Sequence, residues 1–144
     1  MVEFKVKVGK IGLEEGVCII PFYEHDPPRP AIELPESIDK LVSKVAGRGF
    51  KGKLEEVYIF PTFLDKGPEK IALVGLGERN GLELDSFRRA YGRAAIRLDE
   101  SIIESANSAL VKDVFNIEDI AQSIVEGVSL SMYRFDRYKS ENRK

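Results

Sequence analysis

The chain has 144 residues, of which 43% are hydrophobic and 32% are charged, a composition that excludes a disordered chain and fits one globular domain. The 22 basic residues nearly balance the 24 acidic residues, for a formal net charge of -2, so nucleic acid is disfavoured as a partner. The longest apolar stretches are far too short for a membrane span, and the first residues lack the layout of a signal peptide, so we expect a cytoplasmic protein.

The N-terminal part of the chain contains two strand patterns. Residues 2–8 alternate apolar and charged side chains, which predicts a strand with one exposed face. Residues 17–20 form a continuous apolar run bounded by Gly16 and Pro21, the pattern of a strand buried on both faces. Residues 25–30 contain three prolines. Because proline lacks an N–H and restricts the residue before it, we expect a loop there, with neither helix nor ladder.

The middle of the chain contains one helix pattern and two strand patterns. Apolar residues after Pro35 recur at helical spacing, and Gly47 and Gly49 end the pattern, which predicts a helix of about three turns. Residues 54–60 and 70–76 are apolar runs separated by a turn-like segment that contains glycine and proline. They predict two strands, of which the second is the more buried.

The C-terminal part contains the best-defined helix pattern, over residues 84–105, with arginines mostly opposite the apolar face. Residues 108–114 predict a short strand. Asn116, with Asp119 three residues later, resembles a capping box and predicts the start of a further helix. Residues 134–144 carry many charges and little apolar periodicity, as expected for a solvated tail or linker. The apolar face of the helix predicted over residues 84–105 consists of Leu84, Phe87, Tyr91, Ala94, Ala95, Leu98 and Ile102.

Taken together, the elements follow the order strand, strand, helix, strand, strand, helix, strand, helix. This order predicts an α/β domain, with a mixed sheet and helices on both of its faces. We expect a single domain over residues 1–133 and a charged tail or linker over residues 134–144.

The residues capable of acid–base, nucleophilic or metal chemistry are few and scattered. Any catalytic triad would have to use the one histidine, His25, which lies in the proline-rich loop without a nucleophile signature nearby. With one cysteine, Cys18, which we expect to be buried, only carboxylates would remain to complete a zinc site, and none has ligand spacing. The pairs 55–56 and 99–100, and His25 with Asp26, are sequence neighbours that point in different directions. We therefore predict no catalytic and no metal-binding residue.

The glycine-containing segment 73–81 is the most suggestive local feature, because it follows a buried strand and precedes a helix. The N–H groups of Gly75, Gly77 and Gly81 are weak candidates for binding an anion or a nucleotide phosphate. The spacing from Gly77 to Gly81 is one residue too long for the dinucleotide fingerprint, and Glu78 would repel an anion. A tight turn out of the sheet is the preferred interpretation.

Three stretches of the sequence resemble the N-terminal domain of leucyl aminopeptidases. Residues 70–77 (KIALVGLG) and 84–95 (LDSFRRAYGRAA) resemble the strand, the Gly-Leu-Gly turn and the Arg-x-Ala-x-Gly-x-Ala-Ala helix of that domain. Residues 50–53 look like its Phe-x-Gly-Lys segment. Residues 124–139 (IVEGVSLSMYRFDRYK) are similar to its last helix and its Tyr-x-Phe-x-x-Tyr-Lys exit. The order and the spacing of these stretches also match.

The resemblance implies a macro-domain-like fold, with three layers of helix, sheet and helix. In the family, a larger C-terminal domain binds two divalent metals, zinc or manganese, and removes N-terminal amino acids from peptides. Such metals polarise the scissile carbonyl and activate a water. The metal-binding and catalytic residues of the family lie after the part that this sequence resembles, so none is carried onto it. The resemblance thus implies an accessory domain that is inactive alone.

The accessory domain is expected to pack on the catalytic domain of the same polypeptide and to shape a homo-oligomer, which is hexameric in the family. Some members also bind DNA with this domain, which the acidic balance here disfavours. Two alternatives stay open. One is a free-standing macro-domain-like module that binds ADP-ribose or a related nucleotide at residues 75–81, and the other is an oligomerisation or partner-docking unit.

Overall fold

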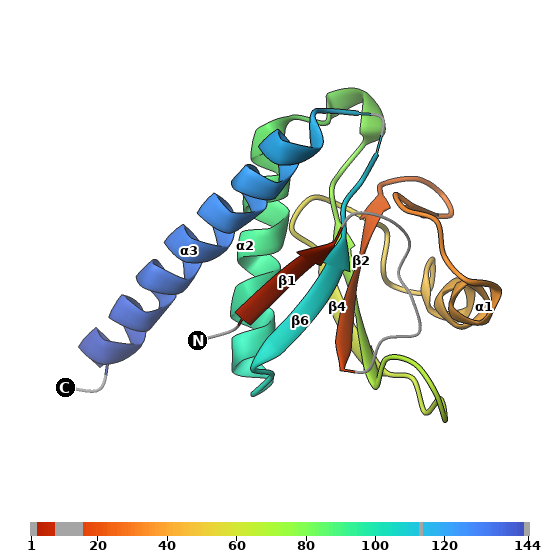
Figure 1. Ribbon diagram of the computed structural model, residues 1–144, viewed down its shortest axis with the longest axis horizontal. Helices are drawn as coiled ribbons and strands as arrows, with labels where there is room; N and C mark the ends of the chain where they lie inside the picture. Colours follow the sequence, from red (N-terminus) through yellow and green to blue (C-terminus); the bar gives the residue numbers. More distant parts are fainter. Residues whose placement is uncertain (1–2, 8–15, 113, 143–144) are drawn as a thin grey trace.

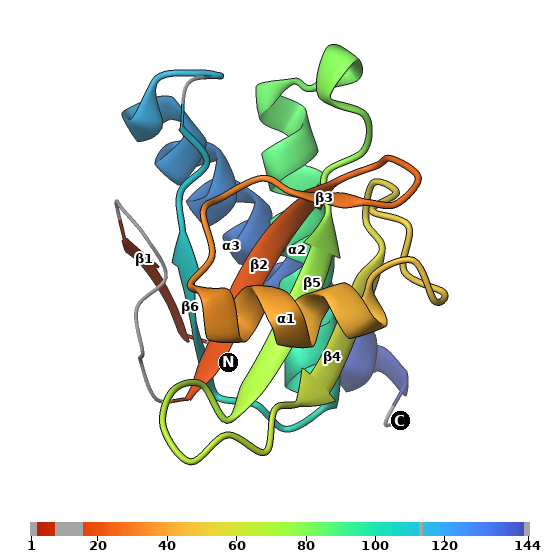
Figure 2. The same ribbon diagram turned by 90° about the vertical axis from the view of Figure 1, so that its right-hand side faces the viewer.

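The structure, a computed structural model, describes residues 3–7, 16–112 and 114–142. Its centre is a mixed sheet (Figure 1) with the strand order β1-β6-β2-β5-β4, and β3 pairs with β2 off this path (Figure 2). Neighbouring strands along this path are parallel from β1 to β5, and β4 is antiparallel to β5. The strands are β1 (Glu3–Lys7), β2 (Val17–Tyr23), β3 (Arg29–Pro30), β4 (Val57–Pro61), β5 (Lys70–Gly75) and β6 (Ser105–Ala109).

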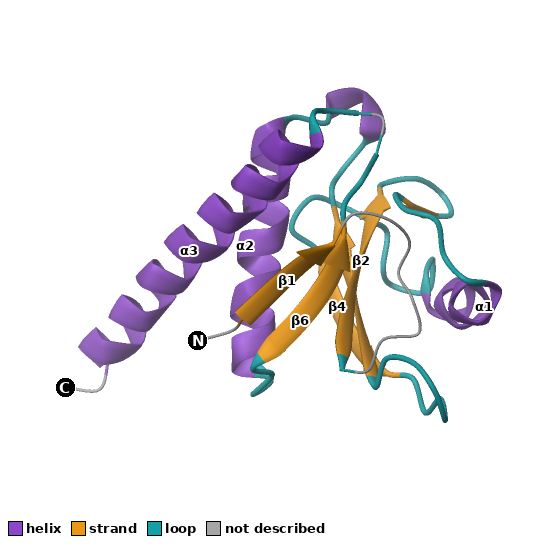
Figure 3. Cartoon of the chain, in the orientation of Figure 1, coloured by secondary structure: helices purple, strands orange, loops and turns teal. Residues whose placement is uncertain are grey.

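Helices cover both faces of the sheet, as the element order predicts. α1 (Glu36–Val45) lies across one face, and α2 (Leu84–Glu100) and α3 (Ile117–Asn142) lie on the other (Figures 2 and 3). A short 3-10 helix, η1 (Arg79–Gly81), precedes α2. The predicted start of the last helix is confirmed, because the Oδ1 of Asn116 accepts a hydrogen bond from the Glu118 N–H at 2.8 Å.

The side chains of β2 show why both faces of the sheet need a cover. Ile19 packs into the hydrophobic cluster under α2 and α3, whereas Cys18 and Ile20 pack into the cluster under α1. In β5, Val74 and Leu73 divide between the same two clusters. This alternation confirms that both runs are strands buried on two faces, that β5 is more buried than β4, and that Cys18 is buried.

Proline does not end β2, contrary to the prediction. The strand continues through Pro21 to Tyr23, and its end pairs with Arg29–Pro30, in a segment for which we expected no ladder. The Pro21 carbonyl accepts a hydrogen bond from the Ala31 N–H at 2.8 Å, on the side of β2 that faces away from β5. Since both backbone polar groups of a strand residue point to the same side, the N–H that Pro21 lacks is not needed for the ladder with β5.

Two residues with left-handed backbone shift the predicted boundaries. Glu55 has a φ of 71°, and β4 begins at Val57 instead of residue 54. Ile102 has a φ of 60° and is 89% exposed, so α2 ends at Glu100 and Ile102 is not on its buried face. β6 consequently starts at Ser105, three residues before the predicted strand. A β-branched residue rarely adopts this conformation, so nothing in the residue types marks the break.

The described part of the charged segment 134–144, which is predicted to be a solvated tail or linker, forms the last turns of α3, which continues to Asn142. Lys139 Nζ donates a hydrogen bond to an oxygen of Asp99 at 2.8 Å, and the Asp99 side chain is only 16% exposed. Lys139 also lies 4.5 Å from the centroid of the Phe135 ring. These contacts hold the charged end of α3 against the end of α2. The role of this segment as a linker to a further domain stays a prediction.

α2 and α3 approach each other closely at two glycines. A Cβ atom on Gly127 would overlap the backbone of Arg88, with the Arg88 Cα at 2.6 Å. A Cβ atom on Gly92 would overlap the Ser131 hydroxyl and lie 2.9 Å from the Gly127 carbonyl oxygen. Residues 88 and 92 of α2 thus meet residues 127 and 131 of α3, so the helices run parallel. Only residues without a side chain permit this distance between the two backbones.

Substitution of Gly127 by alanine tests this contact. Gly127→Ala sets a methyl group against the Arg88 backbone, and overpacking of this kind costs about 1–3 kcal/mol. The better helix propensity of alanine offsets about 1 kcal/mol of that cost. We expect the urea midpoint of unfolding to fall.

Gly81→Ala is the matched control for that measurement, because a Cβ atom on Gly81 meets no atom within 4 Å. Its urea midpoint is expected to stay close to that of the unchanged chain. Equal midpoints for Gly127→Ala and Gly81→Ala would contradict the close approach of the two helices.

A buried hydrogen bond joins α2 to the sheet. Tyr91 is fully buried, and its hydroxyl oxygen lies 2.7 Å from the Ser108 Oγ in β6. Because the Ser108 hydroxyl donates to the Ala109 carbonyl at 3.0 Å, the Tyr91 hydroxyl is the donor to Ser108. Burial raises the pKa of Tyr91 to about 12, and the hydrogen bond with Ser108 acts in the opposite direction.

The raised pKa of Tyr91 predicts a loss of stability at alkaline pH. Between the ordinary tyrosine pKa of 10.0 and the folded-state pKa of about 12, the unfolded chain loses the proton and the folded chain keeps it. The free energy of unfolding therefore falls as the pH rises through this window, by at most about 3 kcal/mol. Urea unfolding at pH 9 and pH 11 measures this fall, which should shrink in Tyr91→Phe and persist in Tyr58→Phe, a change at an exposed tyrosine. An unchanged fall in Tyr91→Phe would refute the assignment.

Candidate functional site

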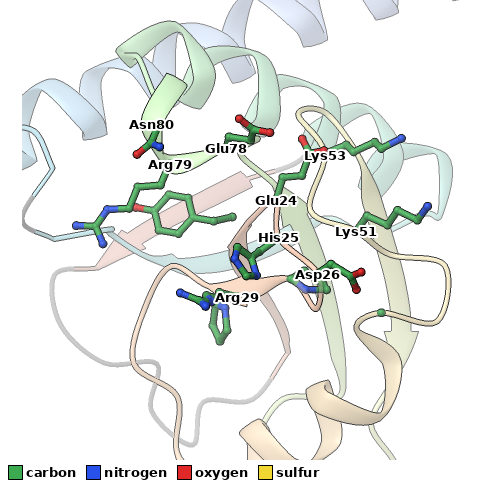
Figure 4. Close-up of a pocket in the computed structure, with 13 residues that line it drawn as sticks. Glu24, His25, Asp26, Arg29, Lys51, Lys53, Glu78, Arg79 and Asn80 are labelled. Atoms are coloured by element: carbon green, nitrogen blue, oxygen red, sulfur yellow. The ribbon is translucent and has the colours of Figure 1, made fainter.

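A cavity of about 800 Å³ opens where the carboxyl ends of β2 and β5 meet (Figure 4). We call it the strand-end cavity. Its walls come from the end of β2 and the loop before β3, from the loop after α1, and from the residues of η1. It is lined by Tyr23, Glu24, His25, Asp26, Pro28, Arg29, Pro30, Gly47, Lys51, Lys53, Glu78, Arg79 and Asn80.

The loop that carries Lys51 and Lys53 is wedged between the two strand ends. The Gly77 N–H donates a hydrogen bond to the Gly52 carbonyl at 3.0 Å. A Cβ atom on Gly52 would lie 2.6 Å from the Tyr23 carbonyl oxygen, and one on Gly75 would overlap the Lys53 carbonyl. The Phe-x-Gly-Lys segment therefore needs its glycine, because the ends of both strands touch it there.

The three candidate glycines lie beside the cavity, but their N–H groups are already used. The N–H groups of Gly75, Gly77 and Gly81 donate to the carbonyls of Glu56, Gly52 and Glu78, at 2.8, 3.0 and 3.1 Å. Gly77 has a φ of 82°, which suits a tight turn. The geometry is that of the preferred interpretation, a turn out of the sheet. Binding of an anion by this loop stays a prediction.

Charged side chains of both signs surround the strand-end cavity. His25 and Asp26 come from the loop between β2 and β3, Arg29 comes from β3, and Arg79 reaches the cavity from η1 (Figure 4). The Arg79 guanidinium lies 5.9 Å from the centroid of the Tyr23 ring. Burial raises the pKa of Tyr23 above its ordinary value, and the positive charge of Arg79 offsets part of this rise. This mixture of charges suits a zwitterionic or polar ligand better than a simple anion.

The sequence predicted only one part of the strand-end cavity, since the candidate ligand loop 75–81 contributes Glu78, Arg79 and Asn80 to its lining. His25 was expected to be a loop residue, and the structure places it on an exposed loop that forms one wall. The signal that was present is the run of prolines over residues 25–30, which fixes a loop directly after a buried strand. The carboxyl end of such a strand is where ligands bind in open α/β sheets.

The predicted divergence of neighbouring carboxylates is confirmed at residues 55 and 56. A carboxylate oxygen of Glu56 accepts the N–H groups of Lys51 and Lys53 at 2.9 and 3.2 Å. The Glu55 carboxylate instead accepts a hydrogen bond from Arg89 at 2.7 Å. The two carboxylates therefore serve different parts of the fold and do not converge on one atom.

The described residues do not fit the divalent metals that the resemblance implies for its family. Within residues 3–7, 16–112 and 114–142, no group of three or more His, Cys, Asp and Glu side chains is arranged to hold a metal ion.

The same ranges hold no helix with the length and apolar character that crossing a membrane would require.

Known proteins resemble this chain in sequence and in fold. A probable cytosol aminopeptidase of Clostridium perfringens is 28% identical over 100% of this chain, which spans only 29% of that relative. The bottromycin maturation enzyme BotP, in complex with Mn, has a TM-score of 0.57 at 19% identity over 90% of this chain and 25% of its own. The macrodomain of Mycobacterium tuberculosis DarG has a TM-score of 0.60 at 12% identity, over 90% of this chain and 92% of its own. The last likeness confirms the macro-domain-like fold.

The family description "Cytosol aminopeptidase family, N-terminal domain" matches residues 19–142. This match contains the three stretches on which the resemblance was based, and it extends that resemblance to β2, the strand at the centre of the sheet. The chain therefore belongs to the cytosol aminopeptidase family, in which it corresponds to the N-terminal domain.

Proposed function

We propose that this chain is the non-catalytic accessory domain of a cytoplasmic aminopeptidase. The observation that carries the proposal is the match of residues 19–142 to the N-terminal domain of the family, with relatives of which the chain spans 29%. In this proposal the larger remainder of the polypeptide binds two zinc or manganese ions and removes N-terminal amino acids from peptides. No step of that reaction is assigned to a residue of this chain.

The proposed role of the domain is to pack on the catalytic domain and to take part in a homo-oligomer. Several large apolar side chains of α3 are exposed, as contact surfaces between domains require. They are Val125, Tyr133 and Tyr138. The same helix is held to the rest of the fold at Gly127 and Lys139, so it presents a rigid surface.

The proposal predicts that the 144-residue chain does not release leucine from a leucyl amide, with or without added zinc or manganese. A full-length relative that cleaves the same amide supplies the positive control. A leucine-releasing activity that co-purifies with the chain through successive chromatography steps would overturn the proposal. Such co-purification would exclude a contaminating peptidase as the source.

The strand-end cavity supports a second candidate function, a module that binds ADP-ribose or a related nucleotide. Its volume of about 800 Å³ falls within the range of small-molecule sites, and Tyr23 and Arg79 offer an aromatic face and a cation for a base and a phosphate. Calorimetric titration with ADP-ribose separates the two candidates. The accessory-domain proposal predicts no heat of binding, and micromolar binding that Arg79→Ala abolishes would favour the nucleotide module.

A further inference from the structure

A second hollow, of about 570 Å³, lies between α2 and α3, on the far side of α2 from the β6 contact of Tyr91. We call it the arginine groove. Arg89 and Arg93 of α2 and Arg134 of α3 line it with cations, and Leu130 and Phe135 supply apolar surface. Gly127 also lines it, and because glycine has no side chain the groove stays open at the point where the two helices touch.

Positive charge is in excess in this groove. Arg89 donates hydrogen bonds through Nη2 and Nε to one oxygen of Glu55, at 2.7 and 3.2 Å. Arg93 Nη2 lies 3.7 Å from the other oxygen of the same carboxylate. One glutamate thus serves two guanidinium groups, and Arg134 forms no ion pair with any carboxylate in the described ranges. The excess is local, because the whole chain has a net charge of -2.

A further arginine of the groove, Arg88, has carboxylate partners of its own. Its guanidinium lies 3.9 Å from an oxygen of Asp85 and 3.6 Å from an oxygen of Glu126. Arg88 is therefore already matched, and the cations with capacity for a ligand are Arg93 and Arg134.

Two features of this arrangement are unfavourable when no ligand occupies the groove. Arg89 and Arg93 are like charges at helical spacing i, i+4, which repel each other. Glu55, which both arginines share, has a left-handed φ of 71° that a non-glycine residue rarely adopts. The side chains of Arg89 and Arg93 are 53% and 50% exposed, and Leu130 is 51% exposed. Guanidinium N–H groups that can still donate hydrogen bonds to a ligand thus lie beside exposed apolar surface.

We propose that the arginine groove binds an acidic peptide segment of a partner protein. An apolar side chain of the segment packs on Leu130 and Phe135, and carboxylates on either side of it pair with Arg93 and Arg134. Guanidinium groups match carboxylates in planar, two-bonded geometry, which favours arginine over lysine here. The apolar surface and the acidic balance of the chain favour a peptide over a nucleic acid, whose binding would need a broadly basic face.

The test is fluorescence anisotropy with a labelled peptide of alternating glutamate and leucine. Reversal of two charges, Arg93→Glu with Arg134→Glu, should raise the Kd of this peptide at least about tenfold. The matched control is Lys44→Glu with Arg48→Glu, which reverses two exposed cations in and just after α1, on the opposite face of the sheet. That control should bind like the unchanged chain. An equal loss in both double variants, or no binding by the unchanged chain, would overturn the proposal.

Two further variants keep the outcome decisive if the charge reversal disturbs the fold. Arg93→Gln with Arg134→Gln removes the charges without adding carboxylates, and Leu130→Gln removes apolar surface without changing any charge. Each should weaken binding of the peptide while the thermal midpoint of unfolding stays within a few degrees of that of the unchanged chain. Full affinity in all of these variants, or tighter binding of a DNA duplex than of the peptide, would count against a peptide site.

Discussion

The close approach of α2 and α3 is the constraint on which one whole layer of this fold depends. α2 is fixed to the sheet by the Tyr91 hydroxyl, and α3 is fixed to α2 where Gly127 meets the Arg88 backbone. The contact lets the hydrophobic cluster below it include residues from both helices and from the sheet. The same glycine lines the arginine groove on the outside. Gly127 thus serves both the packing of the two helices, which Gly92 shares, and the proposed binding surface.

The loop over residues 50–56 connects the strand-end cavity with the arginine groove. On one side Lys51 and Lys53 line the strand-end cavity, and on the other side Glu55 pairs with Arg89 in the arginine groove. The loop is seated at Gly52, between the ends of β2 and β5. The same loop therefore forms part of the wall of both the strand-end cavity and the arginine groove.

The sequence predicted the parts of the fold that repeat with a regular period. The alternation in β2 and β5 follows from burial on two faces, and the apolar face of α2 follows from its contact with the sheet. The predicted element boundaries are wrong at Pro21, where the strand continues through a proline, and at Ile102, which has a left-handed backbone conformation. Neither residue type indicates that outcome. Neither the strand-end cavity nor the arginine groove was predicted as a whole site, because each joins distant segments. Glu55 and Arg89, for example, are 34 residues apart, and no periodicity links them.

Native-state hydrogen exchange tests most directly whether α2, α3 and the sheet form one cooperative unit. If they do, amides of residues 92–98 in α2 and 124–132 in α3 exchange with the same free energy, equal to that of global unfolding, and Gly127→Ala lowers both together. Exchange of the α3 amides at a clearly lower free energy than those of α2 would show that α3 opens by itself, and would contradict the account.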